Sequence, residues 1–420
     1  MDKVRIGLFG CGRGSFVKKY CQKVQNAELV AVCDKVFETQ DIPDNGIAHY
    51  TKFEDFIKHD MDAVVLANYA NEHAPFAIKA MKAGKHVLSE VLPCQCMKEA
   101  VELVETAEAT GMIYAYSENY CYMPAPREMK RLYLAGELGE FEYGEGEYIH
   151  NCEPLWCSIQ DGPDHWRNNM YANFYCTHSI GPLIHITGLR PIKVTGFELP
   201  CNSRTLRMGR KAGAVGIEMI TLENGAMLKS IHGDLGKDSV WYTIYGSKGR
   251  MESEREDVRE GEHAVCTFRK NIDQFEGECA DHIETYRPTD ALTELASGHG
   301  HGSSDFYVMY NFIEKILGNP EADTIDVYEA MDMFLPGLFA YRSVLEGGKS
   351  MDIPNLRFAA DRERYRYDTA CVDPKVAGNQ LLPSYSKGSI EIPDEVYQNM
   401  YTPEAKMRIE RYLTREKNKR

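Results

Sequence analysis

The sequence predicts an α/β domain with a doubly wound parallel sheet, followed by an α+β domain with a mainly antiparallel, open-faced sheet. Two observations support this prediction. Up to Asn119, short apolar runs alternate with helical patterns, which is typical of a parallel sheet whose strands are joined by helices. Beyond Asn119, alternating apolar and polar residues form several β-like runs in succession, which is typical of antiparallel pairing.

The first strand runs directly into a glycine-rich turn. The apolar run 4–9 is followed by Gly10, Gly12 and Gly14. The first glycine allows a tight turn, the second lets a pyrophosphate approach the backbone, and a helix beginning at Ser15 offers free N–H groups to the phosphates. We therefore expect a Rossmann domain in which these four residues and Arg13 bind a dinucleotide. The alternative is a glycine turn in another kind of α/β protein.

The second strand, 27–33, ends in an acidic residue, Asp34. A carboxylate about 20 residues past the glycines binds the adenosine ribose hydroxyls and repels a 2′-phosphate. The cofactor that this arrangement favours is NAD rather than NADP.

The remaining elements follow from apolar periodicity and from turn residues. In the first half we expect helices at 53–57, 73–83 and 97–110, and strands at 62–67, 86–89 and 113–116. In the second half we expect strands at 141–150, 192–199, 215–221, 226–231 and 240–245, and helices at 125–134, 304–317, 327–346 and 406–420. The predicted domains are 1–122 for NAD binding, 123–355 for substrate binding and oligomerisation, and 356–420 as a C-terminal extension.

Composition limits the classes of function. The 420 residues are 43% hydrophobic and 26% charged, which is ordinary for a soluble globular protein. The net charge of −15 argues against nucleic acid or an anionic membrane as the main partner. No bilayer-spanning stretch and no signal peptide is evident. The 13 cysteines, with only Cys94 and Cys96 close together, fit reduced thiols, so we expect a cytoplasmic protein.

Several short motifs occur in a characteristic order. They are Gly10 to Gly12, Asp34, 68–73 (NYANEH), 84–87 (GKHV), Ser89 with Glu90, 117–119 (SEN), and Trp166 with Arg167. Over residues 3 to 350 this order resembles the Gfo/Idh/MocA (glucose–fructose oxidoreductase/inositol dehydrogenase) family. The resemblance implies that Asn68, His73, Glu90, Asn119, Trp166 and Arg167 join the glycine loop and Asp34 in binding NAD.

The chain departs from the ordinary dehydrogenases of that family at two places. Those enzymes have Glu-Lys-Pro after the strand 86–89, whereas this chain has Glu90 followed by Val91 and no lysine. Their second domain carries two acids around a histidine. Here the histidine is kept as His178, and the two acids are replaced by Phe174 and Gly181.

A branch of the family accounts for these departures. The NAD-dependent glycoside hydrolases of the α-N-acetylgalactosaminidase group have Glu-Val-Pro, Tyr-x-Thr-His followed by Gly-Pro, and His-Gly-Gly-x-Asp-Phe. This chain has Glu90-Val91, the segment 175–182 (YCTHSIGP), the segment 301–306 (HGSSDF), and 148–153 (YIHNCE) in place of a Tyr-x-His-Asp segment. Ser303 and Asn151 differ from that pattern, so the identity of the substrate is not carried over.

The resemblance to this branch implies cleavage of a glycoside through transient oxidation. NAD takes a hydride from C3, a base removes the acidified C2 hydrogen, the C1 group leaves, water adds and the hydride returns. His178 is the candidate base for the C3 hydroxyl because imidazole titrates near neutral pH. Tyr175 could act at C2, and Glu153 could be the acid or base at C1. Each of the three could also be a packing or surface residue.

Four further residues are candidate substrate contacts: His150, Asn151, His299 and His301. A metal site formed by the two loop histidines with His150 or His178 is the alternative, but the spacing matches no metal motif, and we expect none. His73 could instead be a surface histidine at a helix start. Asn119 could simply end a strand, and Asp305 could be an acid in the first turn of a helix or a ligand.

Three functions therefore compete. The first is the NAD-dependent glycoside hydrolase, and the second is an NAD-dependent sugar or polyol dehydrogenase of the same family. The third is a cofactor-binding sensor without turnover, which retention of His178 and Tyr175 disfavours. The expected partner is a small carbohydrate or glycoside, and an open sheet face that needs covering predicts a homodimer or homotetramer.

Overall fold

The computed structural model describes residues 3–39, 46–255, 257, 264–275 and 277–417. The chain forms two compact units, each assembled from three separate segments. The first unit contains Met1–Asn119, Asp290–Met331 and Leu356–Asp368, and the second contains Tyr120–Thr289, Asp332–Asn355 and Thr369–Arg420. The predicted continuous ranges 1–122, 123–355 and 356–420 stay a prediction.

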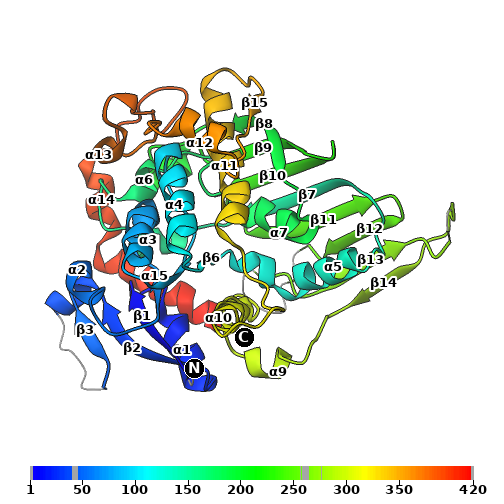
Figure 1. The fold of residues 1–420 in the computed structure, drawn as a ribbon. Coiled ribbons are helices and arrows are strands. Elements are labelled where there is room, and N and C mark those ends of the chain that lie inside the picture. The colour runs from blue at the N-terminus through cyan, green and yellow to red at the C-terminus, as the bar shows by residue number, and fades with distance from the viewer. Residues whose placement is uncertain (1–2, 40–45, 256, 258–263, 276, 418–420) are drawn as a thin grey trace. The chain divides into compact units, whose positions relative to one another are not determined.

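The first unit is built on a six-stranded parallel sheet (Figure 1). Its strand order is β3-β2-β1-β4-β5-β6, the order of the dinucleotide-binding fold. From β1 the strands are added first on one side, as β2 and β3, and then on the other, as β4, β5 and β6. Ligands bind at the carboxyl ends of the strands beside such a point, which here lies between β1 and β4. The strands are β1 (Val4–Phe9), β2 (Ala27–Cys33), β3 (Ala48–Tyr50), β4 (Ala63–Leu66), β5 (His86–Ser89) and β6 (Tyr114–Tyr116).

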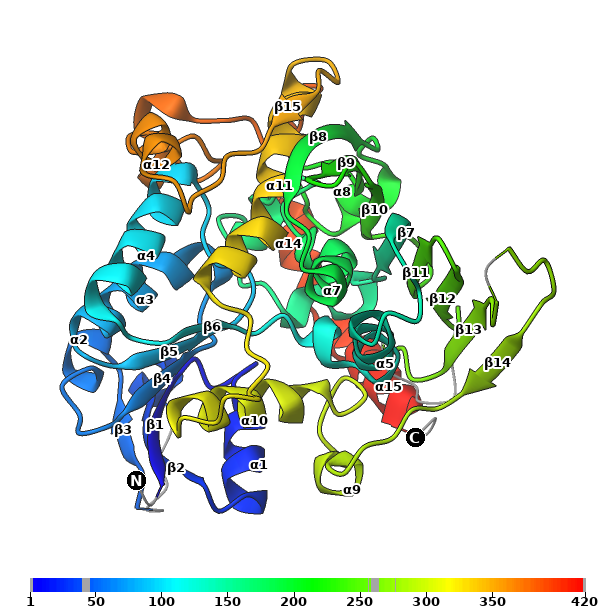
Figure 2. The ribbon, with the colours of Figure 1, turned by 45° about the vertical axis from the view of Figure 1, so that its right-hand side comes forward.

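Helices cover both faces of this sheet, as a buried parallel sheet requires. In Figure 2, α3 and α4 lie on one face, and α1 with α10 lies on the other. Gly111, with φ +65°, ends α4 in the left-handed conformation that favours glycine. The helices of this unit include α1 (Ser15–Lys23), α2 (Phe53–Phe56), α3 (His73–Lys82), α4 (Met97–Thr110), α9 (Thr293–Ala296), α10 (Ser304–Ile316) and α12 (Ala359–Tyr365).

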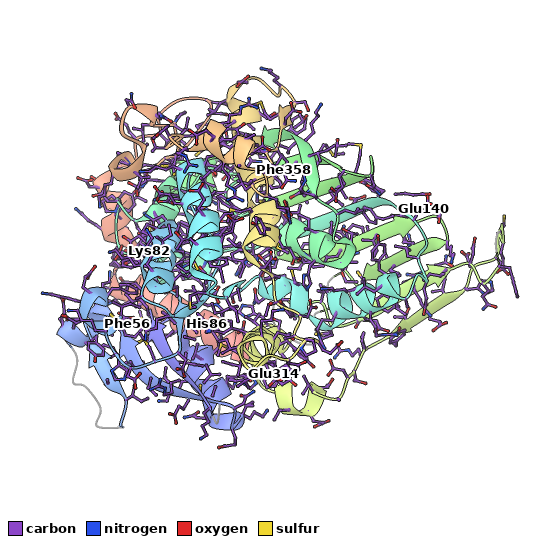
Figure 3. All side chains as sticks on the ribbon, viewed as in Figure 1. Phe56, Lys82, His86, Glu140, Glu314 and Phe358 are labelled. Atoms are coloured by element: carbon purple, nitrogen blue, oxygen red, sulfur yellow. The ribbon has the colours of Figure 1, made fainter. Side chains whose placement is uncertain are left out.

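The core of the first unit packs closely against β1. Phe56 on α2 is fully buried (Figure 3), and so is Met61 except for 2% of its surface. A Cβ at Gly7 would lie 2.3 Å from the Met61 sulfur and 2.6 Å from the Phe56 ring. A larger residue at this position of the strand would force the Met61 and Phe56 side chains to move.

The second unit contains a nine-stranded sheet in the order β14-β13-β12-β11-β7-β10-β9-β8-β15. All neighbours in it are antiparallel except β7 and β10, which pair in parallel. The mainly antiparallel sheet is as predicted. Its strands are β7 (Phe141–Ile149), β8 (Pro191–Glu198), β9 (Val215–Leu222), β10 (Met227–Gly233), β11 (Ser239–Gly246), β12 (Gly249–Ser253), β13 (Phe268–Ile272), β14 (Ile283–Tyr286) and β15 (Met351–Asp352).

Helices α5 (Pro124–Leu134) and α7 (Thr177–Thr187) pack side by side over this sheet. The contact between α7 and β7 is unusually close, because a Cβ at Gly146 would lie 1.8 Å from the Ser179 carbonyl oxygen. The other helices that lie wholly or partly in this unit include α6 (Trp166–Asn169), α8 (Ser203–Arg207), α11 (Val327–Leu345), α13 (Pro374–Ala377), α14 (Asp394–Met400) and α15 (Pro403–Lys417).

Two general expectations can be compared with the structure. Among the described residues, no helix has the length and apolar character needed to cross a bilayer. All 13 cysteines are free thiols.

Candidate functional site

The glycine loop has one open side. Gly10 has φ +95°, and a Cβ there would lie 2.4 Å from the Ala67 carbonyl oxygen. A Cβ at Gly14 would lie 2.4 Å from the Leu8 side chain, whereas a Cβ at Gly12 would meet no atom within 4 Å. Two of the glycines are thus required by the fold, and the third leaves open space next to α1, which begins without a side-chain cap. This arrangement fits a pyrophosphate at the loop.

Asp34 links the end of β2 to the glycine loop. Its carboxylate accepts hydrogen bonds from Cys11 N at 2.7 Å and from Val36 N at 3.0 Å. The side chain is half-buried, and it lies where an acidic residue of this fold binds ribose. Asp34 therefore has a part in shaping the loop as well as a position suited to the cofactor.

Three more predicted cofactor residues follow the carboxyl ends of neighbouring strands. Asn68 follows β4, Glu90 follows β5 and Asn119 follows β6. Because the strands are parallel, these ends lie along one edge of the sheet, together with the glycine loop and Asp34. The Arg13 guanidinium lies 3.0 Å from Glu90 Oε1 and also binds Asp305.

His73, at the start of α3, is buried, so the alternative of a surface histidine is wrong. Its Nδ1 lies 2.8 Å from the Leu92 carbonyl oxygen, and its Nε2 lies 3.3 Å from that of Asn68. Burial lowers the pKa of His73 to about 4, against smaller opposing effects of the backbone carbonyls. The imidazole is therefore neutral near pH 7.

Trp166 and Arg167 belong to the second unit, whereas the other predicted cofactor residues belong to the first. They lie on α6, and the Arg167 guanidinium stacks over the Trp166 ring at 4.4 Å. Their assignment to NAD stays a prediction.

In the second unit, three tyrosines surround the imidazole of His178, which is 6% exposed. The His178 ring centroid lies 4.4 Å from that of Tyr120, 4.7 Å from Tyr148 and 5.0 Å from Tyr175. Desolvation raises the pKa of Tyr148 well above its usual value, and the neighbouring Tyr120 and Tyr175 add to the rise. Tyr120 and Tyr148 were not predicted as site residues, although Tyr120 directly follows the motif 117–119 and Tyr148 is the first residue of the segment 148–153.

The first turn of α7 holds His178 in place. Position 182 is a proline and offers no N–H to the His178 carbonyl oxygen, which instead accepts a hydrogen bond from the buried Tyr242 hydroxyl. The next residue, Ser179, shares a hydrogen bond of 2.7 Å with Ser230 Oγ on β10. His178 is thereby fixed from two strands of the sheet.

Behind this turn lies a buried pair of titratable groups, Glu218 and His232. His232 Nδ1 lies 3.1 Å from Ser230 Oγ, and its Nε2 lies 3.8 Å from Glu218 Oε1. Asn173 donates to the same Glu218 oxygen at 3.3 Å. Burial raises the pKa of Glu218 to about 8 and lowers that of His232 to about 3. Both groups are therefore neutral near pH 7.

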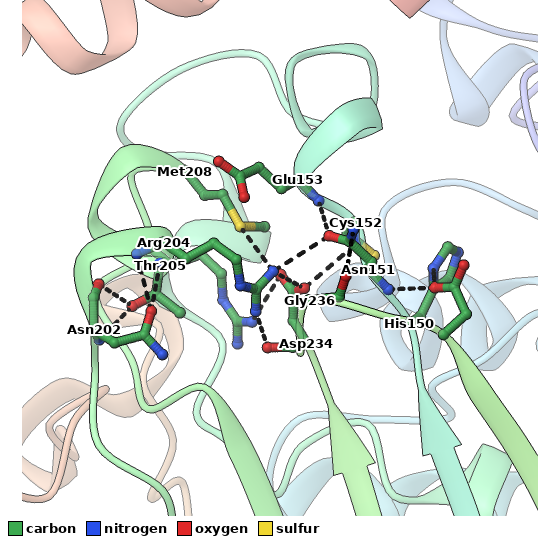
Figure 4. A network of polar contacts seen from close by, with 12 residues as sticks. His150, Asn151, Cys152, Glu153, Asn202, Arg204, Thr205, Met208, Asp234 and Gly236 are labelled. Carbon is green, nitrogen blue, oxygen red and sulfur yellow. Dashed lines mark hydrogen bonds and ion pairs between the residues drawn. The ribbon is translucent and has the colours of Figure 1, made fainter. Parts of the chain in front are cut away.

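The segment 150–153 lies beside an arginine-rich helix (Figure 4). His150 Nδ1 lies 3.3 Å from Asp238 Oδ1, and although burial lowers its pKa, the Cys152 thiol and the Asp238 carboxylate raise it to about 10. Asn151 Oδ1 accepts from Arg204 at 3.4 Å. Glu153 is paired with Arg207 at 3.0 Å. Among the predicted residues of this segment, the carboxylate at 153 is thus bound by a cation.

The two histidines of the loop 298–302 differ in exposure. His299 is buried, with Nδ1 3.0 Å from the Ala296 carbonyl oxygen, and burial lowers its pKa. His301 has a side chain that is 37% exposed, with Nδ1 3.0 Å from Asp305 Oδ2. Asp305 lies in the first turn of α10, as one reading of the sequence expected, and it is also the partner of Arg13. Only His301 of the two presents an imidazole to solvent.

The side chains of the described residues do not form an arrangement that binds a metal ion. Within the described ranges, no group of three or more histidine, cysteine, aspartate or glutamate side chains is arranged to hold an ion.

Two family models match different parts of the chain. Residues 4–118 match the model of the oxidoreductase family with an NAD-binding Rossmann fold (GFO_IDH_MocA), and residues 206–360 match the glycosyl hydrolase 109 C-terminal domain. A glycosyl hydrolase family 109 protein of Shewanella putrefaciens is 25% identical, covering 84% of this chain and 85% of its own. Another, from Solibacter usitatus, is 26% identical over 84% and 88% of the two chains.

A solved structure shows the same fold. The NAD-binding oxidoreductase from Klebsiella pneumoniae superposes with a TM-score of 0.70 at 15% identity, covering 84% of this chain and all of its own.

The fold, the cofactor loop and the family models define an enzyme of the oxidoreductase fold with an NAD-binding Rossmann domain. More particularly, the chain joins a segment that matches the NAD-binding domain of the Gfo/Idh/MocA family to one that matches the C-terminal domain of glycosyl hydrolase family 109.

Proposed function

We propose that this enzyme is an NAD-dependent glycoside hydrolase that returns its cofactor unchanged after each turnover. The observation that carries the proposal is the imidazole of His178 surrounded by three tyrosines, in a chain with a glycosyl hydrolase 109 C-terminal domain. An ordinary glycosidase needs two carboxylates flanking the bond, whereas a route through C3 oxidation needs groups that move protons at C3, C2 and C1.

Each proton transfer has a proposed residue. NAD bound at the glycine loop would supply reversible hydride transfer at C3 of the sugar. His178 takes the proton of the C3 hydroxyl, and Tyr175, whose ring lies 5.0 Å from that of His178, acts at C2 or positions the sugar ring. His150, Asn151, Trp166 and Arg167 are proposed to contact substrate or cofactor from the second unit.

Two residues are proposed for the proton at the C1 oxygen, Glu153 and His301. The Glu153 carboxylate is bound by Arg207, which favours its charged form and weakens it as an acid. His301 is bonded through Nδ1 to the buried carboxylate of Asp305, the arrangement in which a carboxylate orients an imidazole for proton transfer. Geometry therefore favours His301, and comparison of the His301→Gln and Glu153→Gln variants decides between them.

The proposal is tested by incubating the purified enzyme with NAD and a panel of aryl glycosides in D2O. Aglycone release, deuterium at C2 of the product and no net NADH are expected. Net NADH accumulation with the glycosidic bond intact would instead support the sugar or polyol dehydrogenase. Absence of both signals over a wide panel of neutral, N-acetylated and acidic sugars would support the non-catalytic sensor.

We also propose that the enzyme is a homodimer or homotetramer. Phe197, Met227 and Tyr245, on three strands of the nine-stranded sheet, are each more than a third exposed. Lys229 and Glu145 pair on adjacent strands of the same sheet, so the surface carries both charges and is able to complement a second copy. Light scattering that finds only a species of the chain's own mass, 47.7 kDa, contradicts this proposal.

A further inference from the structure

Asp305 is the acceptor for three side chains from different parts of the first unit. Arg13 donates to its two oxygens at 3.0 and 2.7 Å, and Asn119 donates at 3.3 Å. His301 Nδ1 lies 3.0 Å from Asp305 Oδ2. Although burial raises the pKa of Asp305, His301 and Arg13 together hold it below its usual value. These three donors therefore stabilise Asp305 in its ionised form.

The loop that carries His301 reaches Asp305 in an unusual backbone conformation. His301 has φ +53° and Ser303 has φ +72°, and this left-handed conformation is strained for a residue with a side chain. A Cβ at Gly300 would lie 2.7 Å from Asp305 Oδ2. Such angles persist only where surrounding contacts hold them, and Asp305 supplies the contact to His301.

Two lysines of α1 hold the other end of the same loop. Lys23 Nζ donates to the Ser297 carbonyl oxygen at 2.8 Å, and Lys19 Nζ donates to that of Gly298. Helix α1 is the helix whose N-terminus fits the pyrophosphate. The loop is thus bound to the phosphate-binding element at both ends, by Arg13 through Asp305 and by these two lysines.

Arg13 lies between two carboxylates. Besides its two bonds to Asp305, its Nη2 lies 3.0 Å from Glu90 Oε1, and the guanidinium stacks over the Phe16 ring at 4.9 Å. Paired arginine–carboxylate bonds fix direction as well as distance. This geometry suits a clamp on the loop, and the prediction from the sequence that Arg13 binds the dinucleotide stays a prediction.

We propose that Arg13 and Asp305 are positioning residues for His301, so that the glycine loop and the imidazole that moves the C1 proton form one rigid assembly. The proposal rests on the proposed function. Asp305 holds Nδ1 of His301 and leaves Nε2 to exchange a proton with the oxygen at C1, and Arg13 keeps the Asp305 carboxylate in the orientation that this requires.

The test compares two glycosides of the sugar that the wild-type enzyme accepts, one with an aryl and one with an alkyl leaving group. An alkoxide needs a proton to leave, whereas a nitrophenolate hardly does. Asp305→Asn and Arg13→Gln are expected to lower kcat for the alkyl glycoside by about 30-fold or more, and for the aryl glycoside by less than about threefold. Deuterium exchange at C2 and the affinity for NAD should stay within about threefold, and Arg13→Lys should restore part of the loss.

Arg5→Gln is the matched control, because Arg5 also binds an aspartate, Asp62, but at the opposite end of β1. This variant should leave kcat unchanged for both the alkyl and the aryl glycoside. Equal losses for the two glycosides, or a large loss of NAD affinity in Arg13→Gln, would overturn the positioning role. If the wild-type enzyme shows no C2 exchange on any sugar, the proposed function fails and this proposal fails with it, whereas exchange in the wild type with equal losses contradicts the positioning alone.

Discussion

The Tyr242 hydroxyl donates a hydrogen bond to the carbonyl oxygen of His178, in the place that a backbone N–H would take in a regular helix. The residue four positions on, Pro182, has no N–H, so β11 supplies the donor that α7 lacks. A side chain of the sheet therefore completes the helix at the residue that we propose as the base.

Removal of this hydroxyl should weaken both the fold and the proposed chemistry. Tyr242→Phe leaves a buried carbonyl without its donor, and we expect a loss of about 1–2 kcal/mol in the free energy of unfolding together with a lower kcat. Urea unfolding and steady-state kinetics measure the two effects. In the Pro182→Ala background, where a backbone N–H returns, the same change should cost less, and equal costs in both backgrounds would contradict this account.

The close approach of Gly146 to Ser179 gives a second prediction. Gly146→Ala places a Cβ 1.8 Å from a backbone oxygen, so β7 and the start of α7 must separate. We expect destabilisation by about 1–3 kcal/mol and a fall in kcat larger than the change in KM, because His178 moves with Ser179. Gly236→Ala is the control, since a Cβ there meets no atom within 4 Å. A Gly146→Ala variant as active as wild type would show that the helix start tolerates displacement.

The buried pair Glu218 and His232 predicts how stability depends on pH. The pKa of Glu218 is about 8 in the native state and 4.5 in the unfolded state. Because the native state holds the proton more tightly, Glu218 makes the free energy of unfolding fall as pH rises from 4.5 to 8. The pKa of His232 is about 3 in the native state and 6.5 in the unfolded state, so His232 makes the free energy of unfolding rise as pH rises from 3 to 6.5. The two slopes oppose each other between about 4.5 and 6.5, and between 6.5 and 8 Glu218 alone contributes a fall of about 1.4 kcal/mol per pH unit.

Glu218→Gln should remove the contribution of Glu218 to the fall and leave the rise that His232 causes below pH 6.5. Denaturant unfolding at half-unit steps from pH 5 to 9 measures both slopes. Glu284→Gln, an exposed carboxylate on β14, should leave the wild-type curve unchanged. If the free energy of unfolding depends on pH in the same way in wild type and in Glu218→Gln, then Glu218 is ionised in the native state.

The glycine loop predicts that two substitutions separate folding from cofactor binding. Gly14→Ala should lower the melting temperature without NAD, because its Cβ would lie 2.4 Å from Leu8. Gly12→Ala should leave that temperature unchanged and reduce the stabilisation that saturating NAD provides. Thermal unfolding with and without NAD distinguishes the two. If Gly12→Ala keeps the full shift with NAD, the pyrophosphate does not approach at Gly12.

Local periodicity predicted most elements of the fold. The helix expected at 97–110 is α4 with the same ends, because its apolar face repeats regularly and Gly111 ends it. Strands β3, β12, β13, β14 and β15 were not predicted, since they are short or carry many polar residues. The parallel pairing of β7 with β10 also follows from no local pattern, because strand partners are chosen by tertiary contacts.

The residues of the candidate site likewise fall into those that local motifs predicted and those that only the folded chain brings together. The glycine loop, Asp34 and the histidine at 178 stand in motifs with fixed spacing, and sequence was enough to single them out. Tyr120 and Tyr148 join His178 only because the chain folds back between them. Asp305 binds Arg13 although the two residues are 292 positions apart in the sequence, and no local motif predicts a contact over that separation.

The first unit is not continuous in sequence, and this has a consequence for synthesis on the ribosome. The buried face of α1 includes Tyr20, which packs against Phe306 of α10, and the edge strand β6 donates a backbone hydrogen bond from Tyr116 to Ile325. Both partners are made long after the first 119 residues, by about 10 to 40 seconds at 5–20 residues per second. During that interval the nascent sheet has an apolar helix face and an open edge, so the unit completes late and needs protection from association until then.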